Sequence, residues 1–183
     1  MSRVRFATAR ALYETFPADV TRITVAPTDE APVTFLKNLS DAGKLEDAVT
    51  FCAFLLPRRE AVWWACGCTK AFLGNHAAGR TAGLRAAEAW VHEPTEEHRV
   101  AALDVGNRGE PDDPSTWLAL GAGWSGGMLS AHPKMPAPVP QYLTPGAARI
   151  AILLAAQHIE PGDRTPRMRA RIAEGIKLAE DGP

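Results

Sequence analysis

Three cysteines are the first candidates for chemistry, because two of them, Cys66 and Cys68, are separated by a single glycine. Structural zinc sites usually place two to four residues between paired cysteines and add a second pair of ligands. This chain has no second pair and no His-x-x-x-His motif, and on a helix the two sulfurs would point about 200° apart. Free cysteine is often a buried apolar side chain. We therefore predict core thiols, with no structural metal, no disulfide and no cofactor.

The residues that could act in catalysis do not form a recognisable set. Ser125 lies in the run Trp-Ser-Gly-Gly, which is not a Gly-x-Ser-x-Gly elbow and does not follow a predicted strand. We interpret Trp124 and Ser125 as a helix end. The histidines show no ligand spacing, and neither standard phosphate-binding loop is present. The acidic run around Glu96 matches the positive end of a helix dipole. We predict no catalytic residues.

Two arginines, Arg58 and Arg59, stand at a predicted helix start directly after Pro57. Positive charge is unfavourable at a helix N-terminus, so both need a partner. A carboxylate of the same chain is the structural interpretation, which we favour because ion pairs are the commoner use of arginine. An anionic ligand or an acidic patch on another protein is the functional one. We expect one arginine to pair with a carboxylate from a different helix and the other to be exposed.

The arginines lie within residues 41–74, the segment around which the rest of the chain is organised. Before Pro57, apolar residues recur at three- and four-residue steps over residues 45–56, which predicts an amphipathic helix. Proline disfavours the helical conformation in the residue before it and suits the first turn of a new helix. Residues 61–69 carry no charge, as in a buried helix, but are too few to span a bilayer. We predict a buried central helix at residues 61–72, with at least one of Trp63 and Trp64 in the core and both as the preferred arrangement.

Proline and acidic residues mark further helix starts, and no clear alternation indicates strands. We predict an all-α fold, an orthogonal bundle of about eight helices in a single domain over residues 1–183. Residues 126–143 are rich in proline and glycine and are expected to be a connecting loop. Besides the central helix, the segments expected to be helical are residues 8–16, 31–39, 41–56, 79–92, 94–106, 114–124 and 144–158, and a last helix opening at Thr165-Pro166.

Composition restricts the class of protein. The formal net charge of −1 argues against a general nucleic-acid binder, and 46% hydrophobic residues is ordinary for a globular chain. Residues 1–5 lead into no apolar segment, so we expect no signal peptide. An odd number of cysteines without framework spacing is typical of a reducing compartment. We expect a cytoplasmic protein with no membrane insertion.

Several motifs resemble an uncharacterised bacterial family, a domain of unknown function. The resemblance covers roughly residues 12–179 and implies an all-helical fold and a bacterial origin, but no activity. Some members are encoded near secretion-system genes. Glu93 and Met128 depart from the family pattern, which has Asp and Ser there. The motifs are Asp47-Ala48-Val49-Thr50-Phe51, Leu56-Pro57-Arg58-Arg59-Glu60-Ala61-Val62-Trp63-Trp64-Ala65-Cys66, Ala89-Trp90-Val91-His92-Glu93-Pro94-Thr95, Trp124-Ser125-Gly126-Gly127 and the proline-rich stretch leading to Leu143-Thr144.

Two functions are therefore kept open. The first is a non-enzymatic protein-interaction or adaptor protein whose partner is another protein; the resemblance adds a role accessory to a secretion apparatus. The second is a small helical enzyme or ligand-binding protein with an anion-accepting pocket at Arg58, Arg59 and Glu60. A deep pocket with these side chains converging favours the second, and an exposed apolar patch favours the first. The candidate contact residues are Arg58, Arg59, Glu60, Trp124 and Ser125. The sequence leaves the oligomeric state open.

Overall fold

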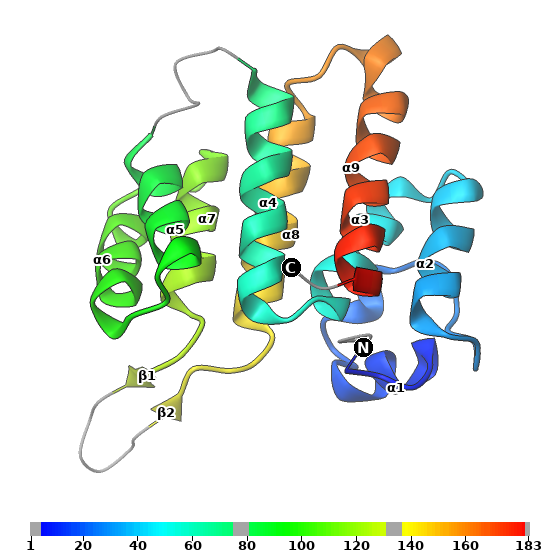
Figure 1. The fold of residues 1–183 in the computed structure, drawn as a ribbon, viewed down its shortest axis with the longest axis horizontal. Coiled ribbons are helices and arrows are strands. Elements are labelled where there is room, and N and C mark those ends of the chain that lie inside the picture. The colour runs from blue at the N-terminus through cyan, green and yellow to red at the C-terminus, as the bar shows by residue number, and fades with distance from the viewer. Residues whose placement is uncertain (1–4, 75–80, 131–136, 182–183) are drawn as a thin grey trace.

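The computed structural model describes residues 5–74, 81–130 and 137–181, and within them the chain is almost entirely helical. Figure 1 shows the helices, with a single small hairpin at one end. The prediction of an all-α fold is confirmed. In chain order the elements are α1 (Ala9–Thr15), η1 (Val20–Arg22, a 3-10 helix), α2 (Pro32–Asp41), α3 (Leu45–Leu55), α4 (Arg58–Leu73), α5 (Ala82–His92), α6 (Glu96–Asn107), α7 (Pro114–Gly123), β1 (Met128–Ser130), β2 (Ala137–Pro138), α8 (Leu143–Ala156) and α9 (Pro161–Asp181).

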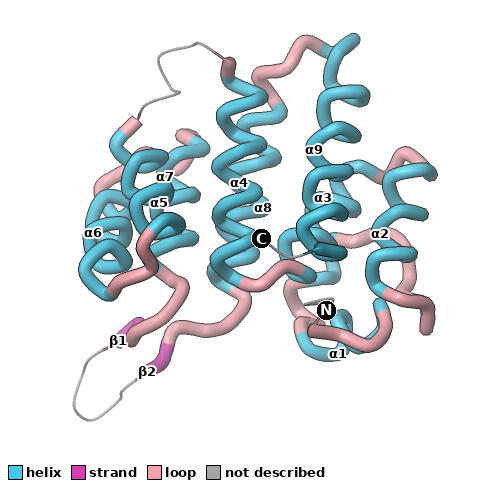
Figure 2. Tube along the Cα trace, in the orientation of Figure 1, coloured by secondary structure: helices cyan, strands magenta, loops and turns pink. Residues whose placement is uncertain are grey.

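The central helix is α4, and it begins where the sequence predicts. Leu56 ends α3 in an extended conformation and Pro57 is the N-cap residue of α4. Helix α4 packs against α8, α5, α7 and α9. Figures 1 and 2 show α4 and α8 running alongside each other in the middle of the molecule. On the two sides of this pair lie α5, α6 and α7, and α2, α3 and α9.

One expectation for the central helix is wrong, because Trp63 is not in the core. Trp64 is only 3% exposed, whereas Trp63 is 45% exposed. The exposed face of α4 follows helical spacing through Trp63, Gly67 and Lys70, of which Gly67 is half-buried. The absence of charge over residues 61–69 did not reveal this face, because it carries a tryptophan and a glycine instead of charged residues.

Two other segments differ from the sequence-based expectation. Helix α9 begins at Pro161, so that Pro166, expected at its first turn, lies inside the helix. In the expected loop at 126–143, β1 and β2 form an antiparallel pair with Met128 opposite Pro138 and Ser130 opposite Ala137. The start of α8 also falls within that range, at Leu143. The prolines at 133 and 136 lie outside the described residues.

The core runs continuously from the N-terminal helices to α9. Its largest aromatic cluster joins α1, α2 and α3, where the rings of Phe35 and Phe51 lie 4.9 Å apart and those of Phe16 and Phe54 lie 5.1 Å apart. Edge-to-face and tilted ring pairs of this kind add stabilisation beyond the burial of their area. None of the described helices combines the length and hydropathy that a membrane crossing requires.

Candidate functional site

Arg58 and Arg59 bind the ends of neighbouring helices. Arg58 Nη1 donates to the carbonyl oxygen of Ser125 at 2.5 Å, just beyond α7. Arg59 Nε donates to the carbonyl oxygen of Val91 at 2.7 Å, in the last turn of α5. Carbonyls at a helix C-terminus lack intrahelical donors and carry the negative end of the dipole. Both guanidiniums thus donate to carbonyl oxygens, whereas the sequence predicts that one arginine pairs with a carboxylate and that the other is exposed; Arg59 is exposed.

The junction between the end of α3 and the start of α4 contains further charged groups. Glu60 is buried, and Arg5 Nη2 donates to the carbonyl oxygen of Phe54 at 3.2 Å, at the end of α3. Burial lowers the pKa of Arg5, the charge of Arg58 lowers it further, and Glu60 raises it. The three charged groups therefore act on one another where α3 meets α4. Arg5 and Arg58 both donate to carbonyl oxygens at helix ends.

The Trp-Ser-Gly-Gly motif forms the other side of this junction, with Trp124 as the C-cap residue of α7. Sequence reasoning did not single out Arg99, which is buried and donates from Nη1 to the carbonyl oxygen of Gly123 at 2.7 Å. Its Nε donates to the Glu96 carboxylate at 2.7 Å. Gly127 has a φ of +78°, and a Cβ there would lie 2.7 Å from Arg99 Nη2. The glycine is thus required by backbone conformation and by Arg99.

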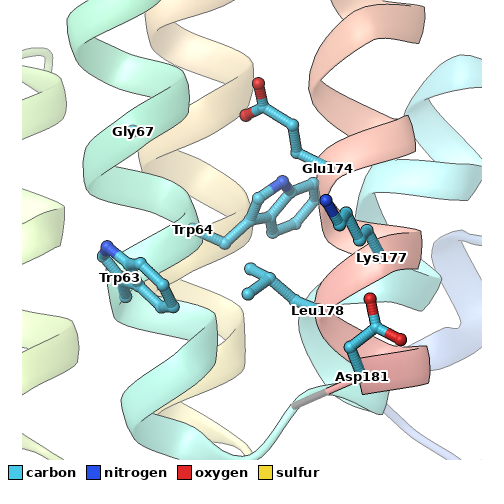
Figure 3. A pocket seen from close by; sticks show the side chains of 7 residues that line it. All are labelled: Trp63, Trp64, Gly67, Glu174, Lys177, Leu178 and Asp181. Carbon is cyan, nitrogen blue, oxygen red and sulfur yellow. The ribbon is translucent and has the colours of Figure 1, made fainter. Parts of the chain in front are cut away.

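The structure brings Arg58 to Ser125 and Arg59 to the end of α5, each through a hydrogen bond to a backbone carbonyl. A groove of about 450 Å³ lies between α4 and α9. Figure 3 shows Trp64 extending from α4 toward α9 and Leu178 extending from α9 toward α4, whereas the Trp63 side chain lies over the face of α4. We call this the α4–α9 groove; it is lined by Trp63, Trp64, Gly67, Glu174, Lys177, Leu178 and Asp181.

Trp64 fixes the two walls of the groove relative to each other. Its Nε1 donates to the carbonyl oxygen of Arg171 in α9 at 2.8 Å. At Gly175, one turn further along α9, a Cβ would lie 2.9 Å from Trp64 Cε2 and 2.5 Å from Cys52 Sγ. Helix α9 can approach this closely only because Gly175 has no side chain. The groove is therefore preformed by buried contacts.

The open side of the groove combines an exposed tryptophan with a helical glycine. A Cβ built at Gly67 would meet no atom within 4 Å, so packing does not explain the glycine. Glycine inside a helix costs roughly 0.5–1 kcal/mol relative to alanine. Gly67 lies one helical turn after Trp63 and leaves the space beside the indole empty. Sequence reasoning missed this site because it placed Trp63 in the core.

Charged side chains line the α9 side of the groove. Glu174 Oε1 forms an ion pair with Arg171 Nη2 at 2.6 Å within the same helix. Lys177 and Asp181 both lie on exposed positions and have no ion-pair partner among the described residues. In Figure 3, Glu174, Lys177 and Asp181 follow one another along α9 beside the apolar floor. The groove therefore offers an apolar floor and charges of both signs at its edge.

The cysteines lie in the core, as predicted, and burial there makes their thiols poorly reactive. Cys52, Cys66 and Cys68 are all buried free thiols. Burial raises the pKa of Cys66 to about 12 and that of Cys68 well above its ordinary value. A thiol with a raised pKa carries little of the reactive thiolate. In the described part of the chain, no three His, Cys, Asp or Glu side chains gather where they could hold a metal ion.

Comparison with known proteins places the chain in a family but does not supply an activity. No curated protein and no solved structure is significantly similar to it. The model of one protein family, described as a family of unknown function (DUF6931), matches residues 35–179. This match includes α4, all but the last two residues of α9, and every residue that lines the α4–α9 groove except Asp181. The chain therefore belongs to the family of unknown function DUF6931.

Proposed function

We propose that this chain is a non-enzymatic protein-interaction or adaptor protein that binds a partner protein in the α4–α9 groove. The observation that carries the proposal is Trp63, a large aromatic side chain 45% exposed at the edge of an apolar groove. Tryptophan is among the residues that most often dominate the binding energy of protein interfaces. A preformed groove also lowers the ordering cost of binding.

The alternative, an anion-binding pocket or active site at Arg58, Arg59 and Glu60, has less support. Both guanidiniums already donate to backbone carbonyls. A ligand that took their place would leave those carbonyls at the helix ends without their charged donors, at a cost in free energy.

The family resemblance extends the proposal. As parts of it, we expect a bacterial and cytoplasmic protein that assists a secretion apparatus. Its partner is a protein and not a nucleic acid, in line with the net charge of −1. These expectations are tested by identifying what the folded chain captures from its native organism.

The test compares captured proteins between wild type and groove variants. Trp63→Ser removes the exposed aromatic, and Gly67→Leu fills the empty space beside it. Val100→Ser is the matched control, because Val100 is 48% exposed on α6, away from the groove. We expect wild type and the control to capture the same partner protein. That protein should bind each groove variant roughly thirtyfold more weakly than it binds wild type, as for an interface hot spot. If all four chains capture the same proteins equally, the proposal is wrong.

A further inference from the structure

The unpaired charges of the α4–α9 groove have a simple arrangement. Lys177 and Asp181 lie four residues apart on the same side of α9, which is about 6 Å along a helix axis. Their signs are opposite, and Leu178 lies between them. Glu174 is the third charge along this edge, but it already pairs with Arg171. The two charges left to a binding partner are thus one positive and one negative, a helical turn apart.

This pattern is complementary to itself when α9 is repeated in the antiparallel direction. A twofold axis at the level of Ala179 places Lys177 of one copy opposite Asp181 of the other, and Asp181 opposite Lys177. A residue-for-residue match of this kind is what a twofold interface requires. We propose that the α4–α9 groove binds a second copy of this chain, with the two α9 helices antiparallel across a twofold axis.

The charges also select this register over its neighbour. An axis midway between Lys177 and Leu178 would instead place Glu174 opposite Asp181 at both ends, and two such pairs of like charge oppose association. In the favoured register, the two Leu178 side chains lie within about 3 Å of each other along the axis direction. They and Trp63 then cover the apolar floor of the facing copy. This inference rests on the proposed function, because it identifies the partner that the groove binds.

The test uses charge exchange in the full chain, with mass measured by sedimentation over a wide range of concentration. Wild type is expected to reach twice the chain mass of 19.7 kDa. Lys177→Asp turns both attractive pairs repulsive, and Asp181→Lys does the same with the opposite charge. Each variant should dimerise roughly tenfold more weakly or worse at low salt. Arg169→Asp is the matched control, because it makes the same charge change at an exposed position of α9 outside the groove.

Two recombinations separate lost pairing from lost folding. The double variant K177D/D181K should dimerise like wild type, because the pairs are restored with their signs exchanged. A mixture of K177D and D181K chains should form a heterodimer, because one chain then carries two acidic groups and the other two basic groups. A monomeric wild type overturns the inference, as does a dimer that all these variants leave unchanged.

The outcomes distinguish this inference from the proposed function. If wild type is monomeric but captures a different protein in a Trp63-dependent way, the second copy is the wrong partner and the interaction groove stands. If neither self-association nor capture of another protein depends on Trp63, both proposals are wrong.

Discussion

Gly67, which lines the α4–α9 groove, and Gly175, which packs against Trp64, should respond in opposite directions to the same substitution. Gly67 and Gly175 both lie inside helices, so replacement by alanine removes a helix-propensity cost of roughly 0.5–1 kcal/mol at each. At Gly67 the added Cβ meets no atom within 4 Å. Gly67→Ala is therefore expected to raise the free energy of unfolding by roughly that amount.

At Gly175 the same methyl group enters a packed site. The Cβ would lie 2.5 Å from Cys52 Sγ and 2.9 Å from Trp64 Cε2, and both side chains are buried. Overpacking of a core costs roughly 1–3 kcal/mol. Because the propensity gain is common to both variants, the difference between their unfolding free energies should equal this packing penalty, roughly 1–3 kcal/mol.

The assay is urea unfolding followed by far-ultraviolet circular dichroism, at one protein concentration because self-association would shift the midpoint. Cys52→Ala removes the closest atom, so Gly175→Ala should cost less in that background than in wild type. Side chains in contact usually show such coupling. If Gly175→Ala is as stable as Gly67→Ala, the close approach of α9 to Trp64 is wrong, and the preformed groove with it.

Three further predictions concern the tryptophans of α4, the turn after α7 and Tyr13. Trp64→Ala should lower the free energy of unfolding by roughly 3–5 kcal/mol, the range for a buried aromatic, and Trp63→Ala should lower it markedly less. Thermal melts of the two variants check this difference. Gly127→Ala should cost roughly 1–3 kcal/mol because of its positive φ, as measured in urea. Burial raises the pKa of Tyr13 from 10 to about 12. The neutral phenol therefore contributes its full stability to the fold below pH 10, and this contribution is lost as the pH rises towards 12. An ultraviolet titration of the phenolate, with Tyr13→Phe as the reference, checks this.

The helical fold could be predicted because the signals for it are local. Asp113 and Pro114 mark the start of α7, and the Asp113 side chain accepts from the amide of Ser115 at 2.8 Å, as a cap should. Pro57 separates α3 from α4 for an equally local reason. Local signals failed at α9, where Pro166 has the features of a start but the helix begins one turn earlier, at Pro161.

The site was harder to predict because it depends on which faces remain uncovered. A run without charge predicts burial on all sides, yet no described helix covers Trp63. The partners of Arg58 and Arg59 were equally non-local: the carbonyls lie 67 and 32 residues away in sequence. Only the packing of α5 and α7 beside the start of α4 brings them within reach.

Two departures from local rules on α4 therefore have different meanings. Arginines at the start of a helix are unfavourable in isolation, but Arg58 and Arg59 find acceptors at the ends of α7 and α5, and the fold itself accounts for them. Trp63 and Gly67 find no such compensation among the described residues: the indole stays 45% exposed, and the glycine has open space where a side chain would stabilise the helix. Local rules tend to be broken without internal compensation at functional sites. The uncompensated pair, not the arginines, is thus the stronger argument for where this chain binds its partner.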